Sequence, residues 1–485
     1  MAVSMDGPLE DTICAVATPA GEGGIGIVRL SGPRALAVAE RIVRLRSHQA
    51  LGSTPSHTLH LADIIDPDVA SGPDRSVSAH GEPSVRIIDE GFVVYMKGPR
   101  SFTAEDVVEF HCHGNGLVLA QVAEACATAG ARLAQPGEFT KRAFLNGRLD
   151  LTQAEAVLDT IRAKSELGLK LAQRQLRGKL GKQVDRLRTR ILEILAQVEA
   201  GIDFVEEDIS FIRQPALIAS LQGALDEISA VLDAAASGRV LREGARVVIT
   251  GRPNVGKSSL LNSLVGEDRA IVTDIPGTTR DVIEESVVWE GLMITLVDTA
   301  GLRETFDVVE QEGIKRTNQA REHADILLHV LDAAELTEQD IGQHVPIPDG
   351  RQGMVVINKS DLVDATSLAR LTVLVKKHAN YGVLAVSAWT GSGVDELKQS
   401  IRSQLSRVSL ESDEGVTLTN VRHRVALERA ALSLRAALDG ARKTVEPEFV
   451  AMDLRGTADA LGEITGVITS DEILDMIFSQ FCIGK

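Results

Sequence analysis

One short segment near the middle of the 485-residue chain has the residue types needed to bind a polyphosphate. Gly251-Arg-Pro-Asn-Val-Gly-Lys-Ser258 fits the pattern G-x-x-x-x-G-K-S. Its glycines let backbone N–H groups wrap around phosphate oxygens, Lys257 would reach the β- and γ-phosphates, and the Ser258 hydroxyl would bind Mg²⁺. The apolar residues 247–249 before it predict a strand and residues 259–264 after it predict a helix. A P-loop requires this context, because the helix adds the positive end of its dipole.

Three motifs further along the chain indicate a guanine nucleotide. In Asn358-Lys-Ser-Asp361, the Asp361 carboxylate could accept hydrogen bonds from N1–H and the 2-amino group of guanine, a pair of donors that adenine lacks. Ser387-Ala388 could present a backbone N–H to the guanine O6. Asp298-Thr-Ala-Gly301 follows an apolar run, so Asp298 would lie at a strand end near Mg²⁺ and Gly301 would face the γ-phosphate. In this order after a P-loop, these weak motifs predict a Ras-like α/β G domain.

The position after the D-x-x-G motif is unusual. Ras-like GTPases place a Gln there to orient the attacking water, whereas this chain has Leu302, which can neither donate nor accept a hydrogen bond. Another group must therefore hold the water.

The first part of the chain is predicted to contain both strands and helices. No second phosphate loop is expected in it. Residues 11–18 and 26–30 read as strands joined by the glycine-rich turn 21–24, which no G-K-S/T follows. A helix begins at Leu117 and ends near Gly130. The Pro-, Ser- and His-rich residues 52–83 are expected to form an exposed insertion.

Long helices are predicted from Asp150 to about Val240 and again from Val416 to the end of the chain. A helical block on each side of the G domain suggests that this domain is inserted into one helical domain. The segment between Arg162 and Arg190 carries ten basic and two acidic residues. Contact with RNA and an ordinary solvated helix face remain equally open explanations.

Composition narrows the class of protein. A net charge of −17 argues against general coating of nucleic acid, so any RNA contact must be local. Four cysteines without a C-x-x-C pair, and no signal-like or 18-residue apolar segment, predict a cytoplasmic protein without a membrane span. His111-Cys112-His113 lies in a strand-like segment, where neighbouring side chains point to opposite faces, so a metal site is not expected there.

Several motifs together closely resemble the MnmE family, also called TrmE, of tRNA-modification GTPases. They are the P-loop, Asp274-Ile-Pro-Gly-Thr-Thr-Arg-Asp281, Asp298-Thr-Ala-Gly-Leu-Arg-Glu304, the N-terminal motifs Ser101-Phe-Thr-Ala-Glu-Asp106 and Pro136-Gly-Glu-Phe-Thr-Lys-Arg-Ala-Phe-Leu-Asn146, and the terminal Phe481-Cys-Ile-Gly-Lys485. The P-loop alone fits many GTPases, whereas the terminal motif combined with the N-terminal ones is specific. The resemblance spans essentially the whole chain.

The resemblance implies an α+β folate-binding and dimerisation domain (residues 1–147), a discontinuous all-helical domain (148–242 and 408–485) and an inserted G domain (243–407). It further implies a homodimer that forms a heterotetramer with the flavoprotein MnmG. That complex would use GTP and 5-formyl- or 5,10-methylene-tetrahydrofolate to build a carboxymethylaminomethyl or aminomethyl group on C5 of the wobble uridine of tRNA. A ribosome-assembly GTPase and a non-enzymatic GTP-dependent switch are the alternatives, but the first should carry an RNA-binding module after the G domain.

Site residues follow by position. For catalysis, they are Lys257 on the phosphates and Glu310. Glu310 would position the water in place of the missing Gln. For GTP, they are Asn254, Val255, Gly256, Lys257, Ser258, Ser259, Thr273, Asp274, Ile275, Pro276, Gly277, Thr278, Thr279, Asp298, Thr299, Ala300, Gly301, Asn358, Lys359, Asp361, Ser387 and Ala388. Mg²⁺ would be bound by Ser258 and Thr279, and K⁺ by Asn254, Thr273, Ile275 and Thr278.

The resemblance implies a second site for the folate, formed by Arg29, Glu109, Arg148 and Lys485. Arg148 stands where the family pattern leads us to expect a lysine, which keeps the charge and changes the hydrogen-bond geometry. Cys482 would take part in the modification chemistry.

Overall fold

The computed structural model describes residues 11–67, 86–203, 214–233, 235–266, 284–298, 322–336, 352–379, 381–405, 420–443 and 445–485. The chain divides into two compact units. One contains Met1–Leu158, Gln175–Arg213 and Lys443–Lys485, and the other contains Asp159–Arg174 and Gln214–Arg442.

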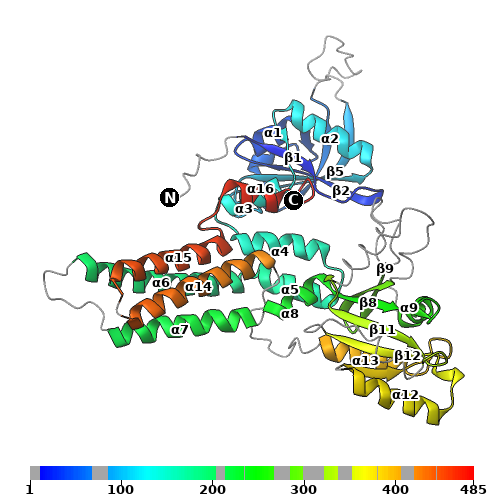
Figure 1. The fold of residues 1–485 in the computed structure, drawn as a ribbon. Helices are drawn as coiled ribbons and strands as arrows, with labels where there is room; N and C mark the ends of the chain where they lie inside the picture. The colour runs from blue at the N-terminus through cyan, green and yellow to red at the C-terminus, as the bar shows by residue number, and fades with distance from the viewer. Residues whose placement is uncertain are drawn as a thin grey trace, which may run out of the picture. The chain divides into compact units, whose positions relative to one another are not determined.

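The first unit contains a seven-stranded sheet with the order β3-β4-β5-β6-β2-β1-β7. Its strands are β1 (Ile13–Val16), β2 (Gly23–Ser31), β3 (Val43–Leu45), β4 (Leu59–Ile65), β5 (Ile87–Met96), β6 (Val107–Gly114) and β7 (Arg132–Leu133). All pairs are antiparallel except β1 with β7. Helices α1 (Ala35–Ile42) and α2 (Gly116–Thr128) cover one face, as Figure 1 shows. The expected helix from Leu117 to near Gly130 is thus confirmed.

The expectation of an exposed insertion over residues 52–83 was wrong for its first part. A short 3₁₀ turn, η1 (Leu51–Ser53), leads into β4, which pairs with β3 and β5 inside the sheet. Ala62 and Ile64 face the core and are fully buried, whereas Leu59 and Leu61 on the other face are exposed. The alternation of a strand was present, but the polar residues around it hid the signal.

The remaining helices of the first unit bring its C-terminal segment against its N-terminal sheet domain. Helix α3 (Glu138–Leu145) contacts α16 (Asp471–Phe478), and α6 (Lys179–Asp203) packs along α15 (Pro447–Thr465). Leu151 and Leu158 of α4 (Leu151–Arg162) share a buried cluster with Phe478 and Phe481. This cluster buries large apolar side chains from two distant parts of the sequence, so the hydrophobic effect holds the C-terminal segment in place.

The second unit contains a six-stranded sheet with the order β13-β12-β11-β8-β10-β9, in which only β9 is antiparallel. Its strands are β8 (Ala245–Gly251), β9 (Glu284–Trp289), β10 (Leu292–Asp298), β11 (Ile326–Asp332), β12 (Gly353–Asn358) and β13 (Gly382–Ala385). Helices α9 (Lys257–Val265) and α13 (Val394–Leu405) pack on one face, and α12 (Ala365–His378) packs on the other. A parallel sheet covered on both faces needs apolar side chains in both directions, and residues 353–358 are all buried.

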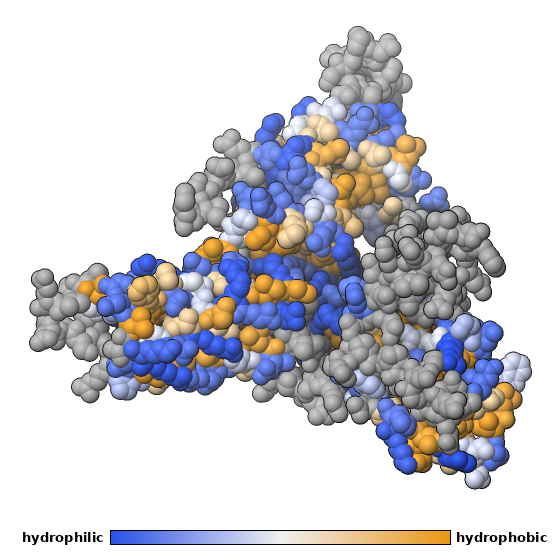
Figure 2. All heavy atoms as spheres, viewed as in Figure 1, coloured by the Kyte–Doolittle hydropathy of each residue, from blue (hydrophilic) through white to orange (hydrophobic). Residues whose placement is uncertain are grey.

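The second unit also contains helices and a turn outside this sheet. These are α5 (Glu166–Leu176, which ends in the first unit), α7 (Gln214–Asp233), α8 (Ala235–Glu243), α14 (Val421–Lys443) and the 3₁₀ turn η3 (Ser360–Leu362). The buried residues of α7 recur at helical spacing, while hydrophilic residues dominate its visible surface in Figure 2. Among the residues that the structure describes, no helix is long and apolar enough to span a membrane.

Candidate functional site

The P-loop joins β8 to α9, as the sequence predicts. Lys257 is buried, and its Nζ donates to the carbonyl oxygens of Gly251 (3.1 Å) and Arg252 (2.7 Å). Gly256 has φ +91°, and a Cβ there would lie 2.3 Å from Asn358 Nδ2, so only glycine permits this close passage. The segment therefore forms a tight loop that carries its ammonium group inward.

The residues proposed to flank Mg²⁺ lie in contact. Asp298 is the last residue of β10 and is fully buried. The Ser258 hydroxyl donates to Asp298 Oδ2 at 2.6 Å. A hydroxyl and a carboxylate placed side by side at the base of a phosphate loop are hard oxygen donors of the kind that Mg²⁺ prefers. These residues fit the ion that the resemblance implies.

The guanine motifs are joined to the P-loop by one buried side chain. Asn358 Nδ2 donates to the Val255 carbonyl (3.0 Å), and Asn358 Oδ1 accepts from the Ala388 backbone N–H (3.0 Å). Ser387 Oγ donates to Asp361 Oδ1 at 2.5 Å. The three motifs, far apart in the sequence, thus meet at the carboxyl ends of β8, β12 and β13. In an open α/β sheet, this edge is where ligands bind.

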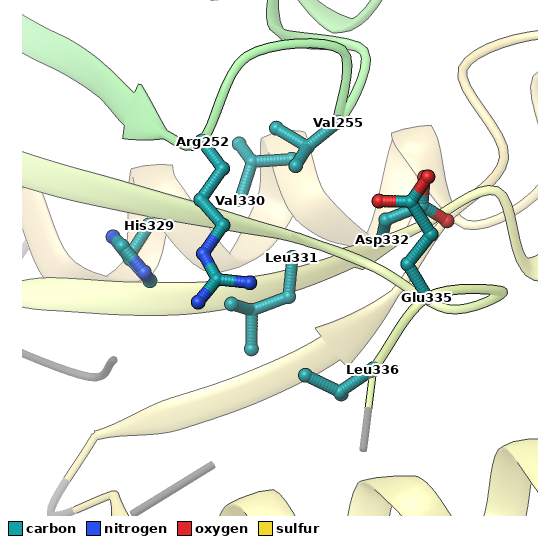
Figure 3. A pocket seen from close by; sticks show the side chains of 8 residues that line it. All are labelled: Arg252, Val255, His329, Val330, Leu331, Asp332, Glu335 and Leu336. Atoms are coloured by element: carbon teal, nitrogen blue, oxygen red, sulfur yellow. The ribbon is translucent and has the colours of Figure 1, made fainter. Parts of the chain in front are cut away.

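A small pocket lies beside the P-loop (Figure 3). Arg252 projects from the loop between His329 and Leu331, while the carboxylates of Asp332 and Glu335 lie at the other end. Asp332 Oδ2 accepts from Lys359 Nζ at 2.6 Å. The lysine of the Asn358-Lys-Ser-Asp361 motif is therefore held against a residue that lines this pocket.

Part of the expected GTP and K⁺ sites lies outside the described residues. This part consists of Thr273, Asp274, Ile275, Pro276, Gly277, Thr278, Thr279, Thr299, Ala300 and Gly301. The expected catalytic Glu310, and Leu302 at the position of the missing Gln, also lie outside the described residues. Their assignments stay predictions.

A second constellation forms in the first unit around Arg29. Arg29 Nε donates to Glu109 Oε1 at 2.7 Å, and both side chains are about 15% exposed (14% and 15%). Arg29 Nη1 donates to the carbonyl of Gly484 at 3.3 Å. Burial and the nearby Arg29 lower the pKa of Lys485, an effect that Glu109 opposes. Three of the four residues expected to contact folate are therefore assembled in one place.

Two phenylalanine rings, which the sequence interpretation missed, complete this group. The Arg29 guanidinium lies 5.5 Å from the ring centre of Phe102 and 5.6 Å from that of Phe139. The guanidinium of Arg148, the fourth residue expected to contact folate, also lies 5.6 Å from the ring centre of Phe102. Both phenylalanines belong to the N-terminal motifs that carry the family resemblance. The motifs therefore marked these two residues, but did not indicate what they do.

The terminal segment is seated closely on the N-terminal domain. Gly484 has φ +99°, and a Cβ there would lie 2.2 Å from the Val16 carbonyl oxygen. The carbonyl of Cys482 accepts from the Gly137 backbone N–H at 3.4 Å. Phe481 is buried, whereas Cys482 and Ile483 are exposed. The exposed Cys482 side chain is therefore not part of the apolar packing around Phe481.

The His111-Cys112-His113 segment lies in β6 and alternates as the sequence predicts. Cys112 is buried, and burial followed by the nearby Asp89 raises the pKa of its thiol to about 12. His111 Nε2 lies 3.4 Å from Glu109 Oε2, and His113 Nδ1 lies 2.8 Å from Asp89 Oδ1. The histidines and the protonated thiol occupy different environments.

Known families and proteins match this chain along nearly its whole length. Residues 151–482 match the family described as the MnmE helical domain, and residues 12–148 match the family described as the GTP-binding protein TrmE N-terminus. The tRNA modification GTPase MnmE of Heliobacterium modesticaldum is 47% identical over 98% of this chain and 99% of its own length. The protein of the same name from Clostridioides difficile is 43% identical over 98% and 100%.

Similarity to solved structures is more local. The G domain of the T. maritima FeoB iron transporter is 28% identical, covers 33% of this chain and 98% of its own, and has a TM-score of 0.25. The assignment of a family rests on the matches that extend along the chain.

Proposed function

The chain belongs to the MnmE family of tRNA modification GTPases, and we propose that it hydrolyses GTP to drive a modification at C5 of the wobble uridine of tRNA. The observation that carries the GTPase part is the buried Asn358, which bonds the P-loop to the Ser387-Ala388 motif and so builds a guanine site on a phosphate loop. The proposed domain division is the one expected from the sequence, with boundaries at residues 147, 242 and 407.

The proposed one-carbon donor is 5-formyl- or 5,10-methylene-tetrahydrofolate, bound by Arg29, Glu109, Arg148 and Lys485. Folate carries carboxylates on its glutamate tail, which suit Arg148 and Lys485, and a pterin whose N–H groups suit a carboxylate such as Glu109. The contacts of Arg29 with Glu109 and the Gly484 carbonyl support one shared site. Cys482 lies exposed two residues from Gly484, where it could act on the transferred unit.

We further propose a homodimer formed through the N-terminal sheet. Leu61 of β4 is paired with Phe92 of β5, and Leu59 lies two residues along the same face. These three side chains are 41–52% exposed (Leu59 52%, Leu61 41%, Phe92 49%). An apolar row of this kind on a sheet face marks an interaction surface, and a second copy of the chain would cover it. Phe92→Glu should therefore convert the dimer into a monomer in sedimentation velocity.

The proposed hydrolysis uses K⁺ in place of an arginine finger and Glu310 in place of the missing Gln. Asn254 is the K⁺ ligand within the described residues, and it has φ +62° in the P-loop. Glu310→Ala should retain GTP affinity and lose turnover, and Na⁺ in place of K⁺ should slow the wild-type protein. Equal rates in the two salts would contradict the proposed K⁺ site.

The proposed partners are tRNA and the flavoprotein MnmG, in the cytoplasm. The basic segment identified in the sequence supports the first, because Arg177, Lys179 and Lys182 are exposed around the start of α6. If they contact tRNA phosphates, Lys182→Glu should weaken tRNA binding and reduce its dependence on salt. A solvated helix face would leave both quantities unchanged.

One experiment tests the function as a whole. Nucleosides from the tRNA of a strain that lacks this gene should be examined by mass spectrometry, with the wild-type gene or Ser258→Ala supplied on a plasmid. We expect the C5-modified wobble uridine to disappear in the deletion strain and to return only with the wild-type gene. Normal modification without the gene would refute the proposal.

A further inference from the structure

We propose that Arg142 and Glu105 are positioning residues for the one-carbon donor site, because the ion pair between the buried Arg142 and the partly buried Glu105 holds the loop that carries Phe102 against Arg29 and Arg148. The assignment of a ligand to this site rests on the proposed function. The loop, residues 97–106, contains the first N-terminal family motif (101–106), and α3 lies within the second (136–146). The function proposed above does not explain most residues of these two motifs.

Arg142 is at the centre of this network and is 0% exposed. Its Nη1 donates to the Asp11 carbonyl (3.0 Å) and to Glu105 Oε1 (3.3 Å). Its Nη2 donates to Asp11 Oδ1 (2.7 Å) and to Glu138 Oε1 (3.0 Å). A buried guanidinium needs several partners in fixed places, so it binds the segment before β1, the loop and the start of α3 into one arrangement.

Glu105 transmits this arrangement to the strand that carries Arg29. Glu105 Oε2 accepts from Ser31 Oγ at 2.6 Å, and Ser31 lies two residues after Arg29 in β2. The Ser31 hydroxyl also lies 2.6 Å from Thr103 Oγ1. Thr103 is fully buried, and its carbonyl accepts from Asn146 Nδ2 at 2.7 Å.

The loop is also closed at both of its ends. Asp106 Oδ1 accepts from the Gly98 backbone N–H at 2.9 Å, and Asp106 Oδ2 accepts from the Tyr95 hydroxyl at 3.0 Å. Burial and then Asp106 raise the pKa of Tyr95 to about 12, so this donor keeps its proton at neutral pH. Ser101 Oγ donates to the Glu105 carbonyl at 2.5 Å. Three hydrogen bonds that involve side chains thus fix the loop to itself and to the end of β5.

The hydrogen bonds of the loop fix the position of Phe102 at the donor site. Its ring packs on a small buried cluster that includes Ile13 and Phe139. The guanidinium groups of Arg29 and Arg148 lie over the ring of Phe102, at 5.5 and 5.6 Å from its centre. If the loop moved, both cations would lose an aromatic surface that orients them. Ordering the loop before the ligand arrives lowers the entropic cost of binding.

The test is a double-mutant cycle with 5-formyltetrahydrofolate as the probe, measured by titration calorimetry on the full-length protein. Glu105→Ala should weaken binding about tenfold, because the loop loses a charge-assisted tie. Phe102→Ala should weaken binding at least as much. The double variant should match Phe102→Ala within about threefold, since Glu105 acts through Phe102. Additive losses, or wild-type affinity in Glu105→Ala, would overturn the proposal.

A second measurement needs no ligand. Hydrogen exchange in Glu105→Ala should accelerate at the amides of residues 97–106 and leave the other strands of the sheet unchanged. Arg132→Gln is the matched control, because Arg132 pairs with Asp11 and Glu138 as Arg142 does, and among its described hydrogen bonds none goes to Glu105. We expect wild-type exchange in this loop for the control. Faster loop exchange in the control as well would overturn the specific role of Glu105.

The two proposals fail in different ways. If the wild-type protein does not bind 5-formyltetrahydrofolate, the proposed donor is wrong, whereas unchanged loop exchange in Glu105→Ala overturns the positioning role itself. Should Glu105→Ala not fold, as judged by its melting transition, Thr103→Val takes its place in the cycle and in the exchange measurement.

Discussion

Replacing Gly484 by alanine tests whether the seated terminal segment is needed for binding at the Arg29 site. Alanine at φ +99° costs about 1–2 kcal/mol in backbone strain. Its Cβ would lie 2.2 Å from the Val16 carbonyl oxygen, a backbone atom that cannot turn aside, so the segment must leave its seat. The hydrogen bond from Arg29 to the Gly484 carbonyl is then lost, which costs about 1.5 kcal/mol more for a charged donor.

Together these effects amount to roughly 3 kcal/mol, or about a hundredfold shift away from the seated conformation. If only the seated conformation brings Lys485 to the ligand, 5-formyltetrahydrofolate should bind up to about a hundredfold more weakly to Gly484→Ala. Titration calorimetry measures this loss, and carboxypeptidase should release Lys485 faster from the variant. Deleting Gly484 and Lys485 should weaken binding in the same way.

Gly201→Ala is the control, since this glycine lies in α6 and no heavy atom is within 4 Å of the added Cβ. It should bind like the wild-type protein and be as stable or slightly more so. Wild-type affinity in Gly484→Ala, with Lys485 still protected from the peptidase, would refute the reasoning.

Three further predictions address other parts of the molecule. Asp361→Asn should weaken GTP binding and favour xanthosine nucleotides, because an amide can donate to the O2 of xanthine; unchanged GTP affinity in a nucleotide titration would remove the assignment. Cys482→Ser should abolish the wobble-uridine modification, measured by mass spectrometry of tRNA, and leave the GTPase rate and the melting temperature near wild type. Burial raises the pKa of Glu138, but hydrogen bonds from Arg132 and other groups outweigh this and lower the pKa below its ordinary value of 4.5. The ionised Glu138 therefore contributes its full stability above pH 4.5, and this contribution is lost as the pH falls below that value. The melting temperature of Arg132→Gln should therefore fall less than that of the wild type between about pH 5 and pH 3. Parallel curves of melting temperature against pH would contradict this expectation.

The sequence alone predicted the local elements of the nucleotide site. The apolar run before Asp298 forms β10 and ends at that residue, and the run before Asn358 forms β12, because continuous apolar segments of this length suit a parallel strand buried on both faces. The glycine spacing around Lys257 likewise predicted the P-loop, since the backbone can close so tightly only without a Cβ at Gly256. Strand β4 was missed, because its alternation is short and lies among turn-forming residues.

Only the tertiary structure decided how the second site is made. Arg29 and Gly484 are 455 positions apart, and no local periodicity relates a strand residue to a terminal tail. The burial of Phe478 and Phe481 against α4 brings that tail to the sheet, and long-range burial is a property of the packed chain, not of any segment of it. The same holds for Arg142, whose charge is buried because Asp11, Glu105 and Glu138 converge on it from three separate segments.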